Sequence, residues 1–262
     1  MSSEESIIGT VKKVFTSFFL SSQQKQSGWD GGTRTNAVFY SPFLNSPGVV
    51  RNQLMHVSDL FPTLLKLAGL RTSPSNIDGV DQWPTINNGG QPARLEVANI
   101  DDVLGYGSYI SFNYKLVNGS SSAGATDNWL TSNNKKENIQ PVDYAVNVLS
   151  STVSRAILSV QKKNRLTIDK ILTLREAATV TCTAKPQENA CDLTKDPCLF
   201  DIIADPCERN NLASSRRLLF AAMKGQYERI RKSVVPTRRK PDGPACDPSH
   251  FNNNWNWWQA DS

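Results

Sequence analysis

Hydrophobic residues occur along this chain in short periodic segments, separated by polar stretches rich in Gly, Pro, Asn and Ser. The first segment, Ala37–Tyr40, is a short apolar run that ends at Ser-Pro, and such a run is typical of a buried strand. Gly31 and Gly32 precede it and favour a tight turn, because glycine adopts backbone angles that other residues resist. We therefore expect a turn that leads into a buried strand.

The next segment has the periodicity of an amphipathic helix. The apolar residues that share one face of this helix are Leu60, Leu64, Leu67 and Ala68. Ser58 is a suitable N-cap, Pro62 fits the first turn, and Gly69 supplies a usual helix stop. Residues 71–92 are rich in Pro, Asn, Asp and Gly, so we expect a surface connection and a domain boundary there.

Beyond residue 92 the pattern becomes that of an antiparallel sheet with helices. Leu95–Ile100 predicts a strand, and Tyr109–Val117 alternates apolar and polar residues as a single half-buried strand does. The expected apolar face of this second strand consists of Ile110, Phe112, Tyr114 and Leu116. Residues 118–140 form a polar loop rich in Gly, Ser and Asn.

Helical periodicity returns twice in the second half of the chain. Val142–Val160 predicts an amphipathic helix, whose stripe consists of Val146, Leu149, Val153, Ile157 and Val160. Leu174–Cys182 is expected to include a strand, and Cys198–Leu212 a strand followed by a tight Asp-Pro turn. The last helix is expected from about Ser214 to Val235, and Pro236 ends it. Its stripe consists of Leu219, Met223, Ile230 and Val234.

Composition limits the classes of protein to which the chain can belong. Its 262 residues are 39% hydrophobic, enough to bury the core of one or two domains. The net charge is +5, and basic residues concentrate at Arg216-Arg217, Arg229–Lys232 and Arg238–Lys240. Such charge attracts nucleic acid, anionic lipid or sulfated glycan, but no nucleic-acid recognition motif accompanies it. No stretch is long and apolar enough to span a membrane, and residues 14–20 match a signal peptide only in part.

The five cysteines favour disulfides over a metal site. They are Cys182, Cys191, Cys198, Cys207 and Cys246. Because no pair has the close Cys-x-x-Cys spacing of a zinc site, the first four are disulfide candidates in an oxidising compartment. Cys246 is then left without a partner in the cluster. Asn118-Gly-Ser is a glycosylation sequon in a polar loop, which agrees with that compartment.

Two groups of residues carry a resemblance to a known family. The first group is Lys25, Trp29, Asp30, Gly31, Gly32 and Arg34, and the second is Ser58, Asp59, Pro62, Thr63 and Leu64. Both resemble motifs of the sulfatase family, in particular its arylsulfatase B-like members. Two later segments, Tyr114–Val117 and Cys198–Leu212, resemble strands of that family's C-terminal domain. The resemblance covers about nine-tenths of the chain and corresponds to the second half of a sulfatase.

The resemblance implies a truncated alkaline-phosphatase-like α/β fold. Residues 1–24 do not resemble the family, and residues 25–92 correspond to the C-terminal part of its catalytic α/β domain. Residues 93–262 correspond to its C-terminal α+β domain, with an antiparallel sheet and a long C-terminal helix. In the arylsulfatase B-like members, a Cys placed like Cys246 pairs with the N-terminal half, so we expect it to be unpaired here. The family also implies a lysosomal or secreted protein.

Sulfatases hydrolyse sulfate esters with a formylglycine, made from the Cys of Cys-x-Pro-x-Arg, and with a calcium ion held by Asp and Asn. This chain contains no Cys-x-Pro-x-Arg, so we expect no catalytic residue, no metal ligand and no activity of the chain alone. Lys25 matches the lysine that contacts the sulfate, a role for which a compact ammonium group is suited. Asp101-Asp102 is expected in a loop without calcium, and His56 is expected to be structural.

Three hypotheses follow from the residues and the resemblance. The chain is an incomplete record of a sulfatase that acts on sulfated glycosaminoglycan or an aryl sulfate. Alternatively, it is an inactive homologue that binds sulfated glycans through basic residues and the tail residues Trp255, Trp257 and Trp258. A third hypothesis is a disulfide-stapled structural module. Because most of the sheet that would bury Ala37–Tyr40 is missing, this strand and the Leu64 face are expected to expose surface that favours aggregation or a partner, which argues for the first hypothesis.

Overall fold

The structure is a computed structural model that describes residues 27–35, 37–45, 49–70, 76–124, 127, 140–160, 166–180, 182, 190–237 and 246–254. The predictions for Lys25, residues 14–20, Arg238–Lys240 and the three tail tryptophans lie outside these ranges. None of the helices within the described ranges combines the length and the apolar character that crossing a membrane requires.

A four-stranded antiparallel sheet forms the centre of the fold, in the order β1-β2-β3-β4. The strands are β1 (Glu96–Asp101), β2 (Tyr106–Ser111), β3 (Tyr114–Asn118) and β4 (Cys198–Asp201). The first three strands follow one another as hairpins, and β4 comes from a segment about eighty residues later and pairs with β3. The Asp-Pro turn and the last helix follow β4, as the sequence predicts.

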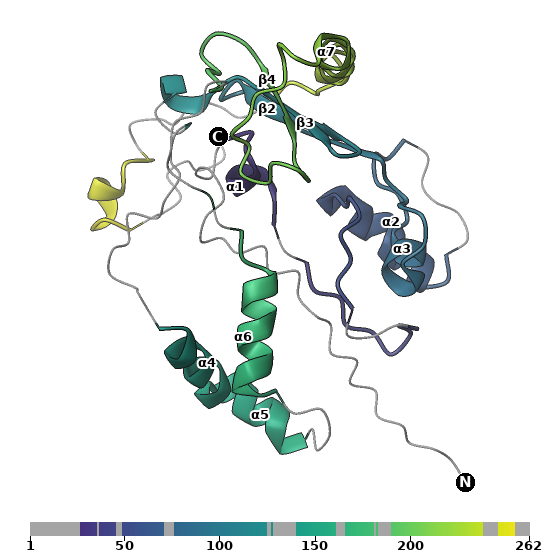
Figure 1. Ribbon diagram of the computed structural model, residues 1–262, viewed down its shortest axis with the longest axis vertical. Helices are drawn as coiled ribbons and strands as arrows, with labels where there is room; N and C mark the ends of the chain where they lie inside the picture. Colours follow the sequence, from purple (N-terminus) through teal and green to yellow (C-terminus); the bar gives the residue numbers. More distant parts are fainter. Residues whose placement is uncertain are drawn as a thin grey trace.

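Helix α7 (Arg217–Arg231) covers one face of the sheet, and the short helix α1 (Asp30–Thr33) lies against the other (Figure 1). The apolar layer on the α7 side consists of Tyr109, Leu116, Leu199, Met223 and Tyr227. The layer on the α1 side consists of Trp29, Val117, Leu193, Cys198 and Phe200. Gly28 lets α1 approach the sheet, because a side chain there would lie 2.4 Å from the backbone oxygen of Gly107.

Two further groups of helices lie beside this sandwich. The 3-10 turn η1 (Val57–Asp59), α2 (Leu60–Leu67) and α3 (Trp83–Asn88) form one group. The helices α4 (Pro141–Ser150), α5 (Thr152–Val160) and α6 (Ile168–Ala177) form another, which stands away from the sheet in Figure 1. The remaining 3-10 turns are η2 (Ser121–Gly124) and η4 (Pro248–Phe251).

The prediction of a turn and a buried strand before residue 41 is wrong. Gly31 and Gly32 lie inside α1, and Ala37–Tyr40 is irregular, with Val38 57% and Tyr40 60% exposed. A strand obtains its backbone hydrogen bonds from a neighbouring strand, and within the described ranges the sheet consists of β1 to β4 and does not include this segment. The apolar run therefore has no sheet in which to be buried.

The single strand predicted over Tyr109–Val117 is a hairpin. Ser111 pairs with Tyr114, so Phe112 and Asn113 form a two-residue loop between β2 and β3. The loop reverses the alternation: Phe112 is 67% exposed, whereas Lys115 is completely buried. The side-chain period of a strand is two, so a turn inside the segment invalidates the faces assigned to it.

Two helical predictions need correction. The helix predicted over Val142–Val160 is broken at Ser151, whose backbone is extended (ψ 150°), and its stripe is exposed, with Val153 at 68% and Val160 at 70%. The strand predicted within Leu174–Cys182 is wrong, because α6 includes residues 174–177. There, Thr167 caps the helix by accepting a hydrogen bond from the Lys170 backbone.

Candidate functional site

A buried ion-pair cluster joins three of the four segments that carry the family resemblance. The Lys115 ammonium lies 2.6 Å from Asp30 Oδ1 and 2.7 Å from Glu208 Oε1. The backbone N–H of Asp30 donates to Glu208 Oε2 at 2.8 Å, and Arg34 lies 3.3 Å from the other Asp30 oxygen. Lys115 is 0% exposed, and the side chains of Asp30 and Glu208 are 7% and 0% exposed. We call Lys115, Asp30 and Glu208 the lysine cluster.

Local structure places each member of the lysine cluster. Lys115 projects from β3 on the face of the sheet that α1 covers. Glu208 follows the Asp-Pro turn with a positive φ of 52°, and Asp205 holds this turn by accepting hydrogen bonds from the backbones of Arg209 and Asn210. The disulfide Cys182–Cys207 fixes the residue before Glu208. The turn therefore places the Glu208 carboxylate against the face of the sheet from which Lys115 projects.

The charges of the lysine cluster shift one another's pKa. Burial disfavours the charged form of Lys115, but Asp30 and Glu208 outweigh burial and raise its pKa. Burial likewise opposes ionisation of Asp30, yet Lys115 and Arg34 hold the pKa of Asp30 below its usual value. Burial raises the pKa of Glu208 to about 7, because Lys115 compensates only in part and the Asp30 carboxylate adds to the rise. The Lys115 ammonium therefore pairs with two carboxyl groups whose pKa values are shifted in opposite directions.

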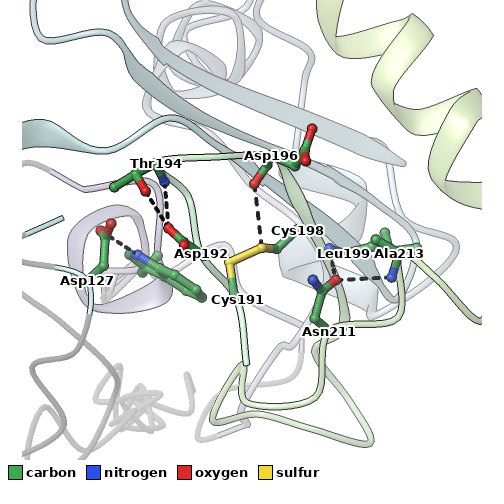
Figure 2. The surroundings of a disulfide bond; sticks show 10 residues. Asp127, Cys191, Asp192, Thr194, Asp196, Cys198, Leu199, Asn211 and Ala213 are labelled. Carbon is green, nitrogen blue, oxygen red and sulfur yellow. Dashed lines mark hydrogen bonds between the residues drawn. A yellow bond between two sulfur atoms is a disulfide. The ribbon is translucent and has the colours of Figure 1, made fainter. Parts of the chain in front are cut away.

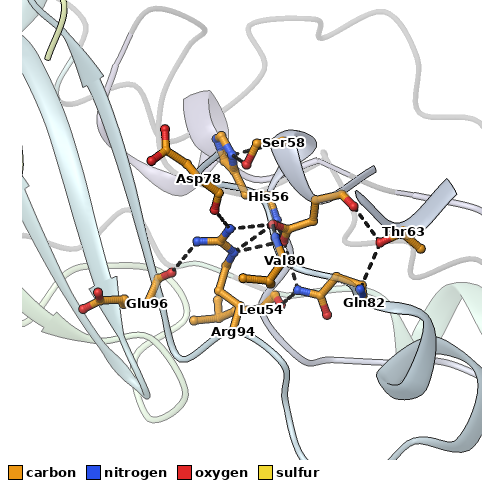
Figure 3. Close-up of polar contacts among 10 residues, drawn as sticks. Leu54, His56, Ser58, Thr63, Asp78, Val80, Gln82, Arg94 and Glu96 are labelled. Atoms are coloured by element: carbon orange, nitrogen blue, oxygen red, sulfur yellow. Dashed lines mark hydrogen bonds and ion pairs between the residues drawn. The ribbon is translucent and has the colours of Figure 1, made fainter. Parts of the chain in front are cut away.

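The second buried cluster surrounds Asp59 at the start of α2 (Figure 3). Arg94 Nε lies 2.9 Å from Asp59 Oδ2, and Gln82 Nε2 donates to the same oxygen at 2.9 Å. The backbone of Val80 donates to Asp59 Oδ1 at 2.9 Å, and the backbone of His56 to Oδ2 at 2.9 Å. Although burial alone would raise it, these donors hold the pKa of Asp59 to about 2. Asp59 therefore ties α2 to the segment before β1.

His56 has the structural role that the sequence predicts, but it also replaces Ser58 as the cap. Its Nδ1 accepts a hydrogen bond from the Ser58 backbone at 3.3 Å and lies 2.8 Å from Ser58 Oγ. Asp59 accepts from the His56 backbone, so the two side chains form a capping box. Ser58 is therefore not the cap that the sequence suggested. Pro62 lies in the first turn and Gly69, with φ 87°, ends the helix, as predicted.

The four clustered cysteines form two disulfides, Cys182–Cys207 and Cys191–Cys198, and Cys246 is free. Figure 2 shows Cys191–Cys198 beside Asp127, which accepts a hydrogen bond from the Trp29 indole at 3.1 Å. Trp29 itself is 2% exposed and its ring centroid lies 5.3 Å from that of Phe200. The disulfide thus belongs to the apolar layer in which Trp29 is buried.

The other candidate residues occupy structural or surface positions. Asp101 ends β1 and accepts hydrogen bonds from the backbones of Val103 and Leu104, so it forms a turn. Asn118 ends β3, is half-buried, and its side-chain amide lies 3.5 Å from the Tyr227 hydroxyl. His250 lies in η4.

No calcium site can be assembled from the residues that the structure describes. Within these ranges, no three His, Cys, Asp or Glu side chains are grouped as metal ligands would be. Three of the four buried carboxylates have partners of the opposite charge: Asp30 and Glu208 pair with Lys115, and Asp59 pairs with Arg94. The fourth, Asp127, accepts a hydrogen bond from the Trp29 indole. The described residues therefore do not fit the family's metal, and we assign it no ligands among them.

Sequence reasoning missed the charged residues that organise both clusters. The patterns place Lys115 on an outer strand face, Arg94 before a strand, and Glu208 in a turn. Apart from its place in the Tyr114–Val117 motif, the signal for Lys115 is its position between apolar residues in β3, a pattern that usually marks a solvated face. Of the motif residues after Lys25, Asp30 has a structural role: its side chain pairs with Lys115 and its backbone with Glu208, and these three side chains have almost no accessible surface.

The sequence matches no family model, but it is similar to sulfatases. It is 28% identical over 238 residues to arylsulfatase J of Mus musculus, covering 89% of this chain and 35% of that protein. It is 43% identical over 67 residues to N-acetylgalactosamine-6-sulfatase of the same species, and 39% identical over 61 residues to arylsulfatase G of Rattus norvegicus. The last two alignments cover 25% and 23% of this chain, and 13% and 12% of those proteins.

Among solved structures, one from work on the metabolism of multiple glycosaminoglycans by Bacteroides thetaiotaomicron aligns with a TM-score of 0.48 and 13% identity. The alignment covers 81% of this chain and 32% of that one, a similarity too remote to assign a function. The chain spans about a third of the length of arylsulfatase J.

Proposed function

We propose that this chain supplies the C-terminal part of a sulfuric ester hydrolase of the sulfatase family, of the arylsulfatase B-like type. The observation that carries the proposal is the sequence similarity to arylsulfatase J, which extends over 89% of the chain. The substrate of the whole protein would be a sulfated glycosaminoglycan or an aryl sulfate. The name of a second relative, N-acetylgalactosamine-6-sulfatase, supports a sulfated amino sugar as the substrate class.

The part of this chain in the reaction would be to hold the anion. Lys25 is the proposed sulfate-binding residue, since a lysine ammonium is a compact charge that neutralises an oxyanion. Lys25 lies four residues before Trp29, and Trp29 and Asp30 are fixed by the disulfide-closed apolar layer and by the lysine cluster. This anchoring supports a positioning role for the apolar layer and the lysine cluster: they would hold the segment from which Lys25 reaches the sulfate.

The chain alone would not hydrolyse the ester. In complete sulfatases formylglycine supplies the nucleophile and calcium holds the sulfate group, and this sequence has no Cys-x-Pro-x-Arg from which formylglycine is made. We therefore assign no catalytic step to residues of this chain. The two disulfides agree with an oxidising compartment, and we propose a lysosomal or secreted location.

Two measurements on the purified 262-residue chain test this proposal. Turnover of 4-nitrophenyl sulfate should be absent, and detectable turnover would refute the assignment of catalysis to residues outside this chain. Binding of a sulfated galactosamine disaccharide should weaken in Lys25→Ala and stay unchanged in Lys66→Ala, which removes a lysine of α2. Equal binding by the two variants would remove Lys25 from the site.

A second candidate function is an inactive homologue that binds sulfated glycans. The observation that favours it is the basic surface of α7, where Lys224, Arg229 and Arg231 are exposed. Phosphate and sulfate groups bind such surfaces in a salt-dependent way. Retention of the chain on a heparin column, reduced in Arg229→Ala/Arg231→Ala and by salt, would support this function, whereas an unretained chain would refute it.

A further inference from the structure

An open pocket of about 310 Å³ lies between the loop of the β2–β3 hairpin and the segment that precedes η1. Its lining includes Asn52, Gln53, Arg94, Leu95, Phe112 and Asn113. This volume is at the lower end of the range that small-molecule sites occupy. None of these residues resembles a catalytic or sulfate-binding residue, so the pocket is a separate feature of the surface.

Phe112 occupies a position in this pocket that folding does not favour. It is the first residue of a two-residue hairpin loop and has a φ of 52°. Such loops usually place Gly, Asn or Asp at positions of positive φ, because a bulky side chain is strained there. The ring is also 67% exposed. A strained residue that presents an aromatic ring to solvent is typical of a binding site.

Gln53 is a second residue of the pocket with an unfavourable arrangement. Its Oε1 is buried and accepts no hydrogen bond from any residue in the described ranges. A buried acceptor without a donor destabilises a fold, so each such atom requires an explanation. Gln53 lines the pocket, so a ligand bound there lies beside its carboxamide.

The charge of the lining decides the class of ligand. Arg94 is the only charged residue among those that line the pocket, and its guanidinium is already paired with Asp59, with Nε at 2.9 Å from Oδ2. The remaining polar groups are the amides of Asn52, Gln53 and Asn113, which both donate and accept hydrogen bonds. A neutral pocket with amides and an exposed aromatic ring suits an uncharged molecule that has many hydroxyl groups and one apolar face.

We propose that this pocket binds a neutral saccharide unit. The Phe112 ring packs on the apolar face of the sugar, and the amides of Asn52, Gln53 and Asn113 pair with its hydroxyl or acetamido groups. This assignment explains why two unfavourable arrangements lie side by side in one pocket. It does not depend on the proposed sulfatase function, since Lys25 takes no part in it.

Saturation-transfer NMR on the oxidised 262-residue chain with N-acetylgalactosamine tests the proposal. The wild type should bind with a Kd on the order of 1 mM, as expected for a shallow site and a single sugar. Phe112→Gly should abolish the transfer and leave the urea midpoint equal or higher, because glycine relieves the positive φ. Phe43→Gly removes a ring that is 70% exposed outside the pocket and should leave the signal unchanged.

A second variant and a second probe make the test decisive. Gln53→Met should weaken binding about fivefold while the urea midpoint does not fall, since it removes a buried unpaired oxygen. Absence of transfer to the wild type, or full transfer to Phe112→Gly, overturns the proposal. Equal binding of N-methylacetamide also overturns it, because the pocket would then recognise an amide instead of a sugar. Lys25→Ala should bind N-acetylgalactosamine as the wild type does, which separates this site from the proposed sulfate site.

Discussion

Replacing Glu208 with glutamine should change how the stability of this protein depends on pH. Glu208 is completely buried, and its carboxylate shares the Lys115 ammonium with Asp30. The glutamine side chain has almost the same shape and would still accept the hydrogen bond from the Asp30 backbone, but it does not titrate. The substitution therefore removes the proton equilibrium of one group and preserves the packing around it.

The magnitude follows from the two pKa values of this carboxyl. The pKa of Glu208 is about 7 in the folded protein, whereas the ordinary value, which applies to the unfolded chain, is 4.5. The folded protein therefore binds this proton more tightly than the unfolded chain does. This contribution to stability is fully present below pH 4.5 and is lost as the pH rises through 7. With about 1.4 kcal/mol for each pKa unit, the wild type should lose roughly 2 to 3 kcal/mol of unfolding free energy between about pH 5 and pH 8 through this group.

Urea unfolding of both proteins at about pH 5 and pH 8, with the disulfides intact, measures this difference. The pH dependence of the wild type minus that of Glu208→Gln isolates Glu208, because all other titrating groups occur in both proteins. Glu208→Gln should gain on the wild type as the pH rises. If the difference between the two proteins is the same at both pH values, Glu208 stays ionised beside Lys115, and the reasoning about unequal carboxylates is wrong.

Two further pairs of variants test the lysine cluster and the disulfides by urea unfolding. Lys115→Met leaves Glu208 buried without a cation and Asp30 with only the exposed Arg34, and it should cost about 3 to 5 kcal/mol. Lys224→Met on the exposed side of α7 should change stability by less than about 0.5 kcal/mol, and similar values for the two variants would contradict the cluster's role. Loop-closure entropy predicts that Cys182→Ala/Cys207→Ala, with a sequence separation of 25, costs about 1 kcal/mol more than Cys191→Ala/Cys198→Ala, with a separation of 7. The reverse order would show that the core position of Cys198 outweighs loop length.

Elements with their own local signals were predictable from the sequence. Strand β1 begins one residue after the predicted start, and β4 with its Asp-Pro turn lies where the motif places it. Helix α7 is shorter at both ends than predicted, but its buried stripe contains Met223 as expected. The cysteine spacing indicated disulfides without deciding which cysteines pair, since only the three-dimensional arrangement brings Cys182 to Cys207.

The β2–β3 hairpin shows why alternation alone misled the prediction. Turns of two residues usually contain Gly or Asn at the position of positive φ, and here that position holds Phe112. Without a glycine, nothing in the sequence marks the reversal, and the alternating pattern continues across it. The same error placed Lys115 on the solvent face, although its partners Asp30 and Glu208 come from segments 85 and 93 residues away in the chain. A buried charge is explained only by residues that the fold brings to it.

Hydrophobic periodicity identifies residues suited to burial, but it does not identify what buries them. In α2, the predicted apolar face is exposed at Leu60 (36%) and Leu64 (58%), and the buried positions are Pro62 and Thr63. Thr63 is buried because its hydroxyl donates to the Asp59 backbone at 2.6 Å and accepts from the Gln82 backbone at 2.9 Å. The orientation of α2 is therefore set by the polar contacts of Asp59, which outweigh the burial of two leucines: a buried carboxylate without partners would cost more free energy than exposed apolar surface.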